Sequence, residues 1–198
     1  MNHARSRTRT HGYTLVELLV VVGVLAIAGT LLLPNLIDKG TFAIQAAARS
    51  IVSDIVFAQS DALANQEYRR FQFISAEAGS EGYTGYCIMR VNPTNMAWPY
   101  DEGTADYIED SMQVARNDGS FIVDFGSDDR FQGVLIESVN LDAGLDYMTF
   151  DEYGGSVSSA GGAPGIGGVI ELASRNQRYR VSVAPFTGKT TVEVLETP

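Results

Sequence analysis

The sequence predicts an α+β protein in which one long N-terminal helix packs, by its second half, against an antiparallel β-sandwich or sheet. Two observations carry this prediction. An apolar run over 13–33 is followed by apolar residues at helical spacing up to about residue 65. Stretches of alternating apolar and polar residues, separated by turn residues, then fill 67–198.

The apolar run is long enough to cross a bilayer. Residues 13–33 contain a single charged side chain, Glu17, and as a helix they would extend about 31 Å, against roughly 30 Å of hydrocarbon. Arg5, Arg7 and Arg9 precede the run. Basic residues on this side predict a cytoplasmic N-terminus and a single pass through the membrane, with the rest of the chain outside.

A cleaved secretory signal peptide is the alternative interpretation of the same run. The segment Ala26-Ile27-Ala28 has the small-residue pattern of a signal-peptidase site. Against it, helix-forming sequence continues well past Ala28, and a carboxylate stands at the head of the apolar run. These two features favour a retained helix.

Glu17 is the most informative residue of this segment. A carboxylate inside a membrane span costs about 2.5–3.5 kcal/mol at the helix centre and less near an end. Cutting the chain between Gly12 and Tyr13 would create a new α-amine at Tyr13 and make Glu17 the fifth residue of the processed chain. That ammonium could pair with Glu17 of a neighbouring copy, which would relieve both buried charges. An interfacial position for Glu17 without such a partner is the simpler alternative.

The segment His11-Gly12-Tyr13-Thr14-Leu15-Val16-Glu17-Leu18 resembles the prepilin processing signature of type IV pilin-like proteins. The resemblance implies that a prepilin peptidase cuts after Gly12 and methylates the new N-terminus at Tyr13. It also implies that Glu17 aligns an incoming subunit with its neighbour. Phenylalanine is commoner than tyrosine at position 13, but methylation acts on the backbone amine.

Helical patterning resumes after Pro34, which follows the apolar run directly. Proline removes one helical hydrogen bond and kinks a helix, so one helix over about 14–65, bent near Pro34 and Gly40, is expected. Its second half has an apolar stripe formed by Ile44, Ala48, Ile51, Ile55, Ala58 and Ala62. The expected organisation is a removed leader (1–12), a membrane helix (13–33), an amphipathic continuation (34–66) and a periplasmic β-rich domain (67–198).

Eight strands are expected in that domain. They are Arg69–Ile74, Thr84–Val91, Ser120–Phe125, Val134–Asn140, Tyr147–Phe150, Gly168–Ala173, Tyr179–Ala184 and Thr190–Leu195. Two segments rich in turn residues, 92–110 and 154–168, are expected to be loops. A turn at Gly188 is expected to join the last two strands as a hairpin.

Composition excludes several classes of chemistry. The only histidines, His3 and His11, precede Gly12, so a processed chain would have no histidine for triad catalysis or metal binding. Cys87 is the single cysteine and is expected to be buried. Four acids are candidate calcium ligands: Asp118, Asp124, Asp128 and Asp129. The Asp-x-Asp-x-Asp-Gly pattern of a calcium-binding loop is absent, however. No enzymatic activity, cofactor or metal is predicted.

Residues 46–73, with Phe150-Asp151-x-x-Gly154 and Pro185-x-Thr187-Gly188-Lys189, resemble the minor pseudopilin H of type II secretion and FimT- and FimU-like minor pilins. This resemblance implies a minor subunit, near the tip of a pseudopilus or type IV pilus, whose partners are other pilins or pseudopilins.

DNA uptake is the alternative function. Arg175, Arg178 and Arg180 lie close together in the sequence, and FimT-like proteins are associated with DNA. Without the leader, however, the net charge is (14 − 3) − 24 = −13, which opposes DNA binding. The simpler interpretation of these arginines is a solvated strand face paired with acids such as Glu171 or Glu193.

Overall fold

The computed structural model describes residues 13–36, 39–76, 82–96, 99–109, 119–158 and 163–195. It contains the helices α1 (Leu15–Leu36) and α2 (Lys39–Asn65) and a short 3₁₀ helix, η1 (Asp129–Phe131). The strands are β1 (Arg69–Ser75), β2 (Tyr83–Arg90), β3 (Asp106–Tyr107), β4 (Ile122–Asp124), β5 (Leu135–Leu141), β6 (Tyr147–Phe150), β7 (Ser156–Val157), β8 (Gly168–Ala173), β9 (Arg178–Val183) and β10 (Thr190–Leu195). The predicted α+β architecture is confirmed.

The strands form one folded antiparallel sheet. Their order is β10-β9-β8-β5-β2-β1-β6-β7, and β3 and β4 also pair with β2. The chain neighbours β1–β2 and β8–β9–β10 form hairpins, whereas the β1–β6 and β5–β8 pairs join segments that are distant in sequence. β2 and β5 share the single register pair Tyr83↔Ile136. Of the two predicted arrangements, sandwich or sheet, the structure therefore adopts a sheet with a narrow junction between two strips.

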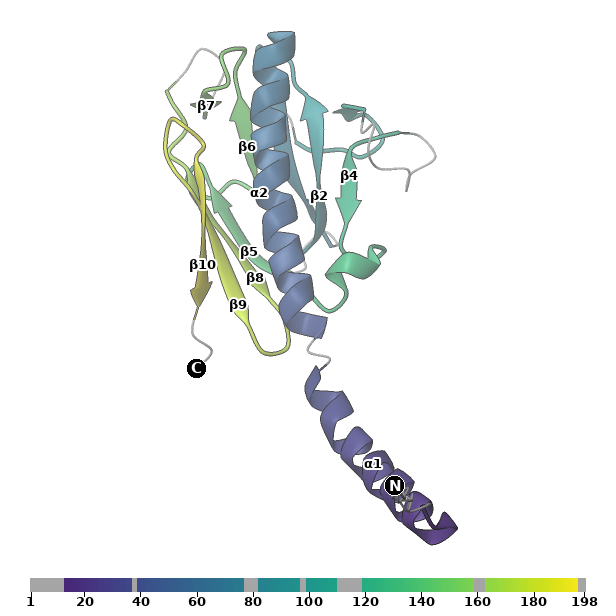
Figure 1. The fold of residues 1–198 in the computed structure, drawn as a ribbon. Coiled ribbons are helices and arrows are strands. Elements are labelled where there is room, and N and C mark those ends of the chain that lie inside the picture. The colour runs from purple at the N-terminus through teal and green to yellow at the C-terminus, as the bar shows by residue number, and fades with distance from the viewer. Residues whose placement is uncertain are drawn as a thin grey trace, which may run out of the picture. The chain divides into compact units, whose positions relative to one another are not determined.

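Helix α2 lies across one face of this sheet (Figure 1). Its contact with the sheet is the apolar stripe expected from the sequence, and all its members are buried: Ile44, Ala48, Ile51, Ile55, Ala58 and Ala62, joined by Ala47. Burying one isoleucine side chain stabilises a fold by about 1.5–3 kcal/mol. Because the alanines are small, the helix backbone can approach the aromatic side chains of β1 and β2 closely. The stripe thus anchors the domain core.

Polar contacts on the two flanks of the stripe hold α2 in register. On one flank the Tyr86 hydroxyl of β2 donates to Asp54 Oδ2 at 2.6 Å and lies 2.9 Å from Ser50 Oγ. Burial, followed by the charge of Asp54, raises the pKa of Tyr86 well above its usual value, so the phenol remains a donor. On the other flank Gln59 Nε2 donates to the carbonyls of Gly154 and Thr187.

The end of α2 is closed by a cap that the sequence did not reveal. Gln66 adopts a left-handed conformation with φ of 53°, and the Glu67 amide donates back to the Ala62 carbonyl at 3.2 Å. This is the Schellman arrangement, usually formed with glycine. The side chain of Arg69, at the start of β1, points back toward α2 and pairs with Asp61 at 2.5 Å.

The two segments expected to be loops each contain a short strand, and the prediction is corrected in this respect. β3 lies in 92–110 and pairs with β2, while β7 lies in 154–168 and pairs with β6. Two-residue strands produce no periodicity, so the sequence could not show them. Residues 97–98, 110 and 159–162 of these segments lie outside the described residues.

Removing core volume from the α2 stripe should destabilise the domain far more than the same change beside it. Ile55 is 0% exposed and Val56 is 48% exposed. Ile55→Ala should cost about 2–5 kcal/mol, because it leaves a cavity, and Val56→Ala well under half of that. Thermal unfolding of the full chain in mild detergent checks this. Equal melting temperatures for the two variants would contradict the assignment of the stripe.

Candidate processing and assembly site

The first turn of α1 is capped by Thr14, the second residue after the predicted cut. Thr14 Oγ1 accepts a hydrogen bond from the Glu17 amide at 3.2 Å, and the Thr14 carbonyl accepts one from Leu18 at 3.1 Å. The order Thr-x-x-Glu is that of a capping box, and an acid in the first turn suits the positive end of the helix dipole. The helix can therefore begin at Leu15 without any help from the leader.

The side chains of α1 are apolar on all sides and exposed. Tyr13 is 79% and Leu15 80% exposed, and the same holds along the described part of the helix for Val16, Leu18, Leu19, Val20, Val21, Val22, Val24, Leu25 and Ile27. A soluble protein does not present a continuous apolar surface of this kind to water. A helix that is apolar all round needs surroundings of lipid or of other apolar helices.

Glu17 is the exception on this surface. It lies in the first turn of α1 and is exposed. Tyr13 lies two residues before the start of the helix, while Gly12 lies outside the described residues. Pro34 lies within the bounds of α1, which continues to Leu36 before α2 begins at Lys39. The bend near Pro34 stays a prediction.

By length and composition, the helical segment Gly40–Asn65 could also cross a membrane, and Leu15–Ala28 forms a shorter apolar helix. The packing distinguishes the two. The apolar residues of α2 form a stripe that is buried in the domain core, and Arg49 lies exposed beside it. Only α1 offers apolar side chains to its surroundings on every side, so α1 is the segment suited to a membrane.

Two of the three arginines considered for nucleic-acid binding, Arg178 and Arg180, are engaged with acids. Arg180 on β9 pairs with Glu171 on β8 at 2.7 Å, the partner expected from the sequence. Arg178 pairs with Glu137 on β5, through Nε at 2.9 Å and also through Nη2. Hydrogen bonding by Arg180 lowers the pKa of Glu171, so this pair is charged at neutral pH. Arg175 lies in the turn between β8 and β9.

Sequence reasoning missed Glu137 as a partner because β5, which carries it, and β9, which carries Arg178, are separated by three strands along the chain. Glu193, the other acid that was expected near these arginines, stands opposite Arg180 in the register of β10. Cross-strand pairs of acids and arginines commonly stabilise a sheet, and these arginines are explained in that way. This pairing leaves little positive charge to attract phosphate.

The acids considered for calcium serve local structure. Asp124 Oδ1 accepts from the Gly126 amide at 2.8 Å, and Asp128 forms an ion pair with Arg130 at 2.6 Å. Asp118 lies outside the described residues. Over the described ranges, His, Cys, Asp and Glu side chains form no group of three that could hold a metal ion. Cys87 is buried, as expected.

The two C-terminal motifs identified in the sequence form turns that contact Gln59 of α2. Asp151 Oδ1 accepts from the amides of Tyr153 and Gly155 and so shapes the turn that presents the Gly154 carbonyl to Gln59. The Gly188 turn closes the β9–β10 hairpin, as predicted, through a bond from Ala184 to Lys189. A side chain at Gly188 would come within 2.8 Å of the Phe150 ring. Both motifs therefore fix the helix to the sheet.

Residues 7–33 match the prokaryotic N-terminal methylation motif. The match includes Gly12, Tyr13 and Glu17 and ends before α2 begins. It supports a type IV pilin-like protein, a class of structural subunits that a prepilin peptidase processes and that assemble with other pilins. It is also consistent with membrane anchoring through α1. The chain matches no curated protein and no solved structure.

Proposed function

We propose that this chain is a minor pilin or pseudopilin, a structural subunit of a type II secretion pseudopilus or a type IV pilus. In this proposal the leader 1–12 is removed after Gly12, Tyr13 is N-methylated, and α1 anchors the chain in the inner membrane. The β-rich domain then lies in the periplasm, and α1 later packs in the filament core. The observation that supports this proposal most strongly is the match to the methylation motif, which falls on a helix whose described side chains are apolar all round except for Glu17.

Glu17 and the new N-terminus supply the chemistry of assembly. A free ammonium at Tyr13 and a carboxylate at Glu17 are both costly in an apolar environment. Contact between the ammonium of one subunit and Glu17 of the next would neutralise both charges. Because Thr14 caps the helix, removal of the leader leaves the first turn intact and Glu17 in place.

The assignment to the group of pseudopilin H and FimT- and FimU-like minor pilins is part of the same proposal. It is supported by the order of elements, a helix with a buried stripe followed at once by β1, and by the two turn motifs that contact Gln59. The DNA-uptake alternative is not preferred, because Arg178 and Arg180 are committed to Glu137 and Glu171.

Processing tests the proposal directly. The intact mass of the wild-type chain from membranes should correspond to a protein that begins at Tyr13 and carries one added methyl group. Gly12→Val should leave an unprocessed precursor, whereas the adjacent change His11→Ala should be processed normally. A wild-type chain beginning at Gly29 would instead indicate ordinary signal-peptide cleavage and would refute the proposal.

Substitution of Glu17 should separate processing from assembly. Glu17→Gln keeps the shape of the side chain and should be cut normally, but it should be recovered in filaments at a strongly reduced level. Breaking one fully buried pair costs on the order of 3–5 kcal/mol. The matched control Glu109→Gln, an exposed acid of the domain, should be incorporated like the wild type. Incorporation of Glu17→Gln at the level of this control would rule out the pairing argument.

A further inference from the structure

Strand β10 forms a free edge of the sheet. It pairs with β9 over its whole length, Thr190–Leu195, without a bulge, and with no other strand in the described part of the chain. Figure 1 shows it at the left edge of the sheet, beside α2 but not beneath it. Its four central residues are all exposed: Thr191, Val192, Glu193 and Val194. Both faces of this strand, as well as its outer edge, are therefore accessible.

The hydrogen bonds at the two ends of β9 fix which backbone groups of β10 are free. The Ala184 amide donates to the Lys189 carbonyl at 2.8 Å, and the Ser174 amide donates to the Gln177 carbonyl at 2.8 Å. Because hydrogen-bonded pairs alternate along an antiparallel ladder, both turns give the same result: the odd-numbered residues of β10 are bonded to β9. The even-numbered residues direct their amides and carbonyls away from β9, and these are Thr190, Val192 and Val194.

The valines among these residues direct their side chains to the face of the sheet on which α2 lies. Val192 and Val194 stand opposite Val181 and Tyr179 in the register, and both of these β9 residues are buried in the core. Because α2 does not extend over β10, Val192 is 43% and Val194 63% exposed. Val56, which is 48% exposed, lies on the flank of α2 that contacts the β9–β10 turn. Apolar side chains are thus available beside an unpaired strand edge.

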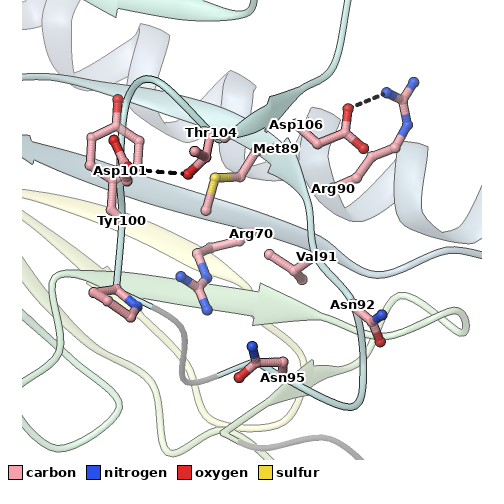
Figure 2. Close-up of a pocket in the computed structure, with 12 residues that line it drawn as sticks. Arg70, Met89, Arg90, Val91, Asn92, Asn95, Tyr100, Asp101, Thr104 and Asp106 are labelled. Carbon is pink, nitrogen blue, oxygen red and sulfur yellow. Dashed lines mark hydrogen bonds and ion pairs between the residues drawn. The ribbon is translucent and has the colours of Figure 1, made fainter.

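Other edges of the sheet are protected, as is usual in soluble β-proteins. β7 is two residues long, and its Val157 is bridged on the outer side to Pro164, which has no amide to donate. β2 is covered on the side away from β1 by β3 and β4, and an ion pair between Arg90 and Asp106 at 3.1 Å joins β3 to β2 (Figure 2). β10 is six residues long and contains no proline, lysine or arginine. An unprotected edge of this kind is a template for a further strand.

Charges on the other face of β10 indicate which strand would suit it. Glu193 is exposed, and the arginine opposite it, Arg180, is paired with Glu171. Lys189, directly before β10, is exposed as well, and neither Glu193 nor Lys189 forms an ion pair with the residues that the structure describes. A second copy of this chain, with a net charge of −10, would be repelled by the first. A different partner with a base opposite Glu193 and an acid opposite Lys189 is complementary to both.

We propose that the free edge of β10 binds an extended segment of a different protein chain, which adds to the sheet as an antiparallel strand. The outward amides and carbonyls of Thr190, Val192 and Val194 supply its backbone hydrogen bonds. The bound segment alternates apolar residues, which pack on the two valines, with polar ones, among them a basic residue opposite Glu193. In strand addition of this kind the main chain provides affinity, and the alternate side chains provide specificity.

The test uses the full chain in detergent micelles and a dye-labelled peptide, Thr-Val-Lys-Val-Thr-Val-Glu, whose binding is followed by fluorescence anisotropy. Antiparallel alignment places its lysine opposite Glu193 and its glutamate opposite Lys189. The amide of its central valine then faces Val192, and the amide of the following threonine faces away. N-methylation of that valine should weaken binding roughly tenfold or more, whereas N-methylation of the threonine should leave affinity within about twofold. The two methylated peptides have the same composition, so uptake by micelles affects them equally.

Variants of the protein locate the site. Glu193→Lys, at an exposed position, should weaken binding of this peptide and strengthen binding of the peptide in which lysine and glutamate are exchanged, each by about two- to fivefold. Val192→Pro removes an outward amide that is not bonded to β9 and should weaken binding roughly tenfold or more. Val192→Thr keeps the amide and the branched shape and should stay within about threefold. The charge exchange does not depend on the stability of Val192→Pro.

The outcomes are distinct. Tighter binding of the peptide methylated at threonine, together with the charge exchange in Glu193→Lys, supports strand addition at β10. Equal affinity of the two methylated peptides, or no binding of the unmethylated one, would overturn it. Unchanged affinities in Glu193→Lys would overturn the assignment of a basic partner. A dimer of the full chain in sedimentation equilibrium that is lost in Val192→Pro would show that a second copy occupies the edge instead.

Discussion

The packing of the α2 stripe against one face of the sheet is the interaction on which the rest of the domain depends. Strands from both strips of the sheet contact this helix, although the strips share only the pair Tyr83↔Ile136. Without α2, the aromatic side chains of β1 and β2 and the aliphatic side chains of β8 and β9 would lose their common cover. The helix therefore joins two strand systems that the sheet alone connects weakly.

The same constraint explains why the two helices differ in composition. α2 needs a stripe that is narrow and rich in alanine, because it packs closely on a sheet, and polar residues can occupy its other faces. α1 has no such restriction and presents apolar side chains all round. A helix of this kind is stable only among lipids or other apolar helices, which is the environment that membrane insertion and filament assembly provide. Glu17 is then the one charged residue in the sequence of α1.

Local patterns in the sequence predicted most of the fold. The stripe from Ile44 to Ala62 and the eight longer strands follow from hydrophobic period, and the Gly188 hairpin from its turn residue. The order of strands did not follow, because β1–β6 and β5–β8 are pairings between distant segments. The strands β3 and β7 were too short to produce a pattern.

Arg69 and Arg70 show most clearly what a sequence alone cannot provide. Two adjacent arginines at the start of a strand would be expected to be exposed, yet each is 1% exposed. Alternation sends them to opposite faces, where Arg69 meets Asp61 of α2 and Arg70 is covered by the segment after β2. Both burials depend on long-range packing. By contrast, the residues of the proposed assembly site, Gly12, Tyr13 and Glu17, lie close together in the chain, so the motif was visible without a structure.

We expect the chain to consist of a self-sufficient domain and a helix that requires apolar surroundings. The contacts that form the core of the domain lie within Lys39–Pro198. The most direct test compares the fragment that begins at Lys39 with the chain that begins at Tyr13, by sedimentation in the absence of detergent. The fragment should be soluble and monomeric and unfold cooperatively, with circular dichroism of mixed helix and strand, while the longer chain should require detergent. A fragment that aggregates without detergent, or a longer chain that remains monomeric in water, would contradict the claim.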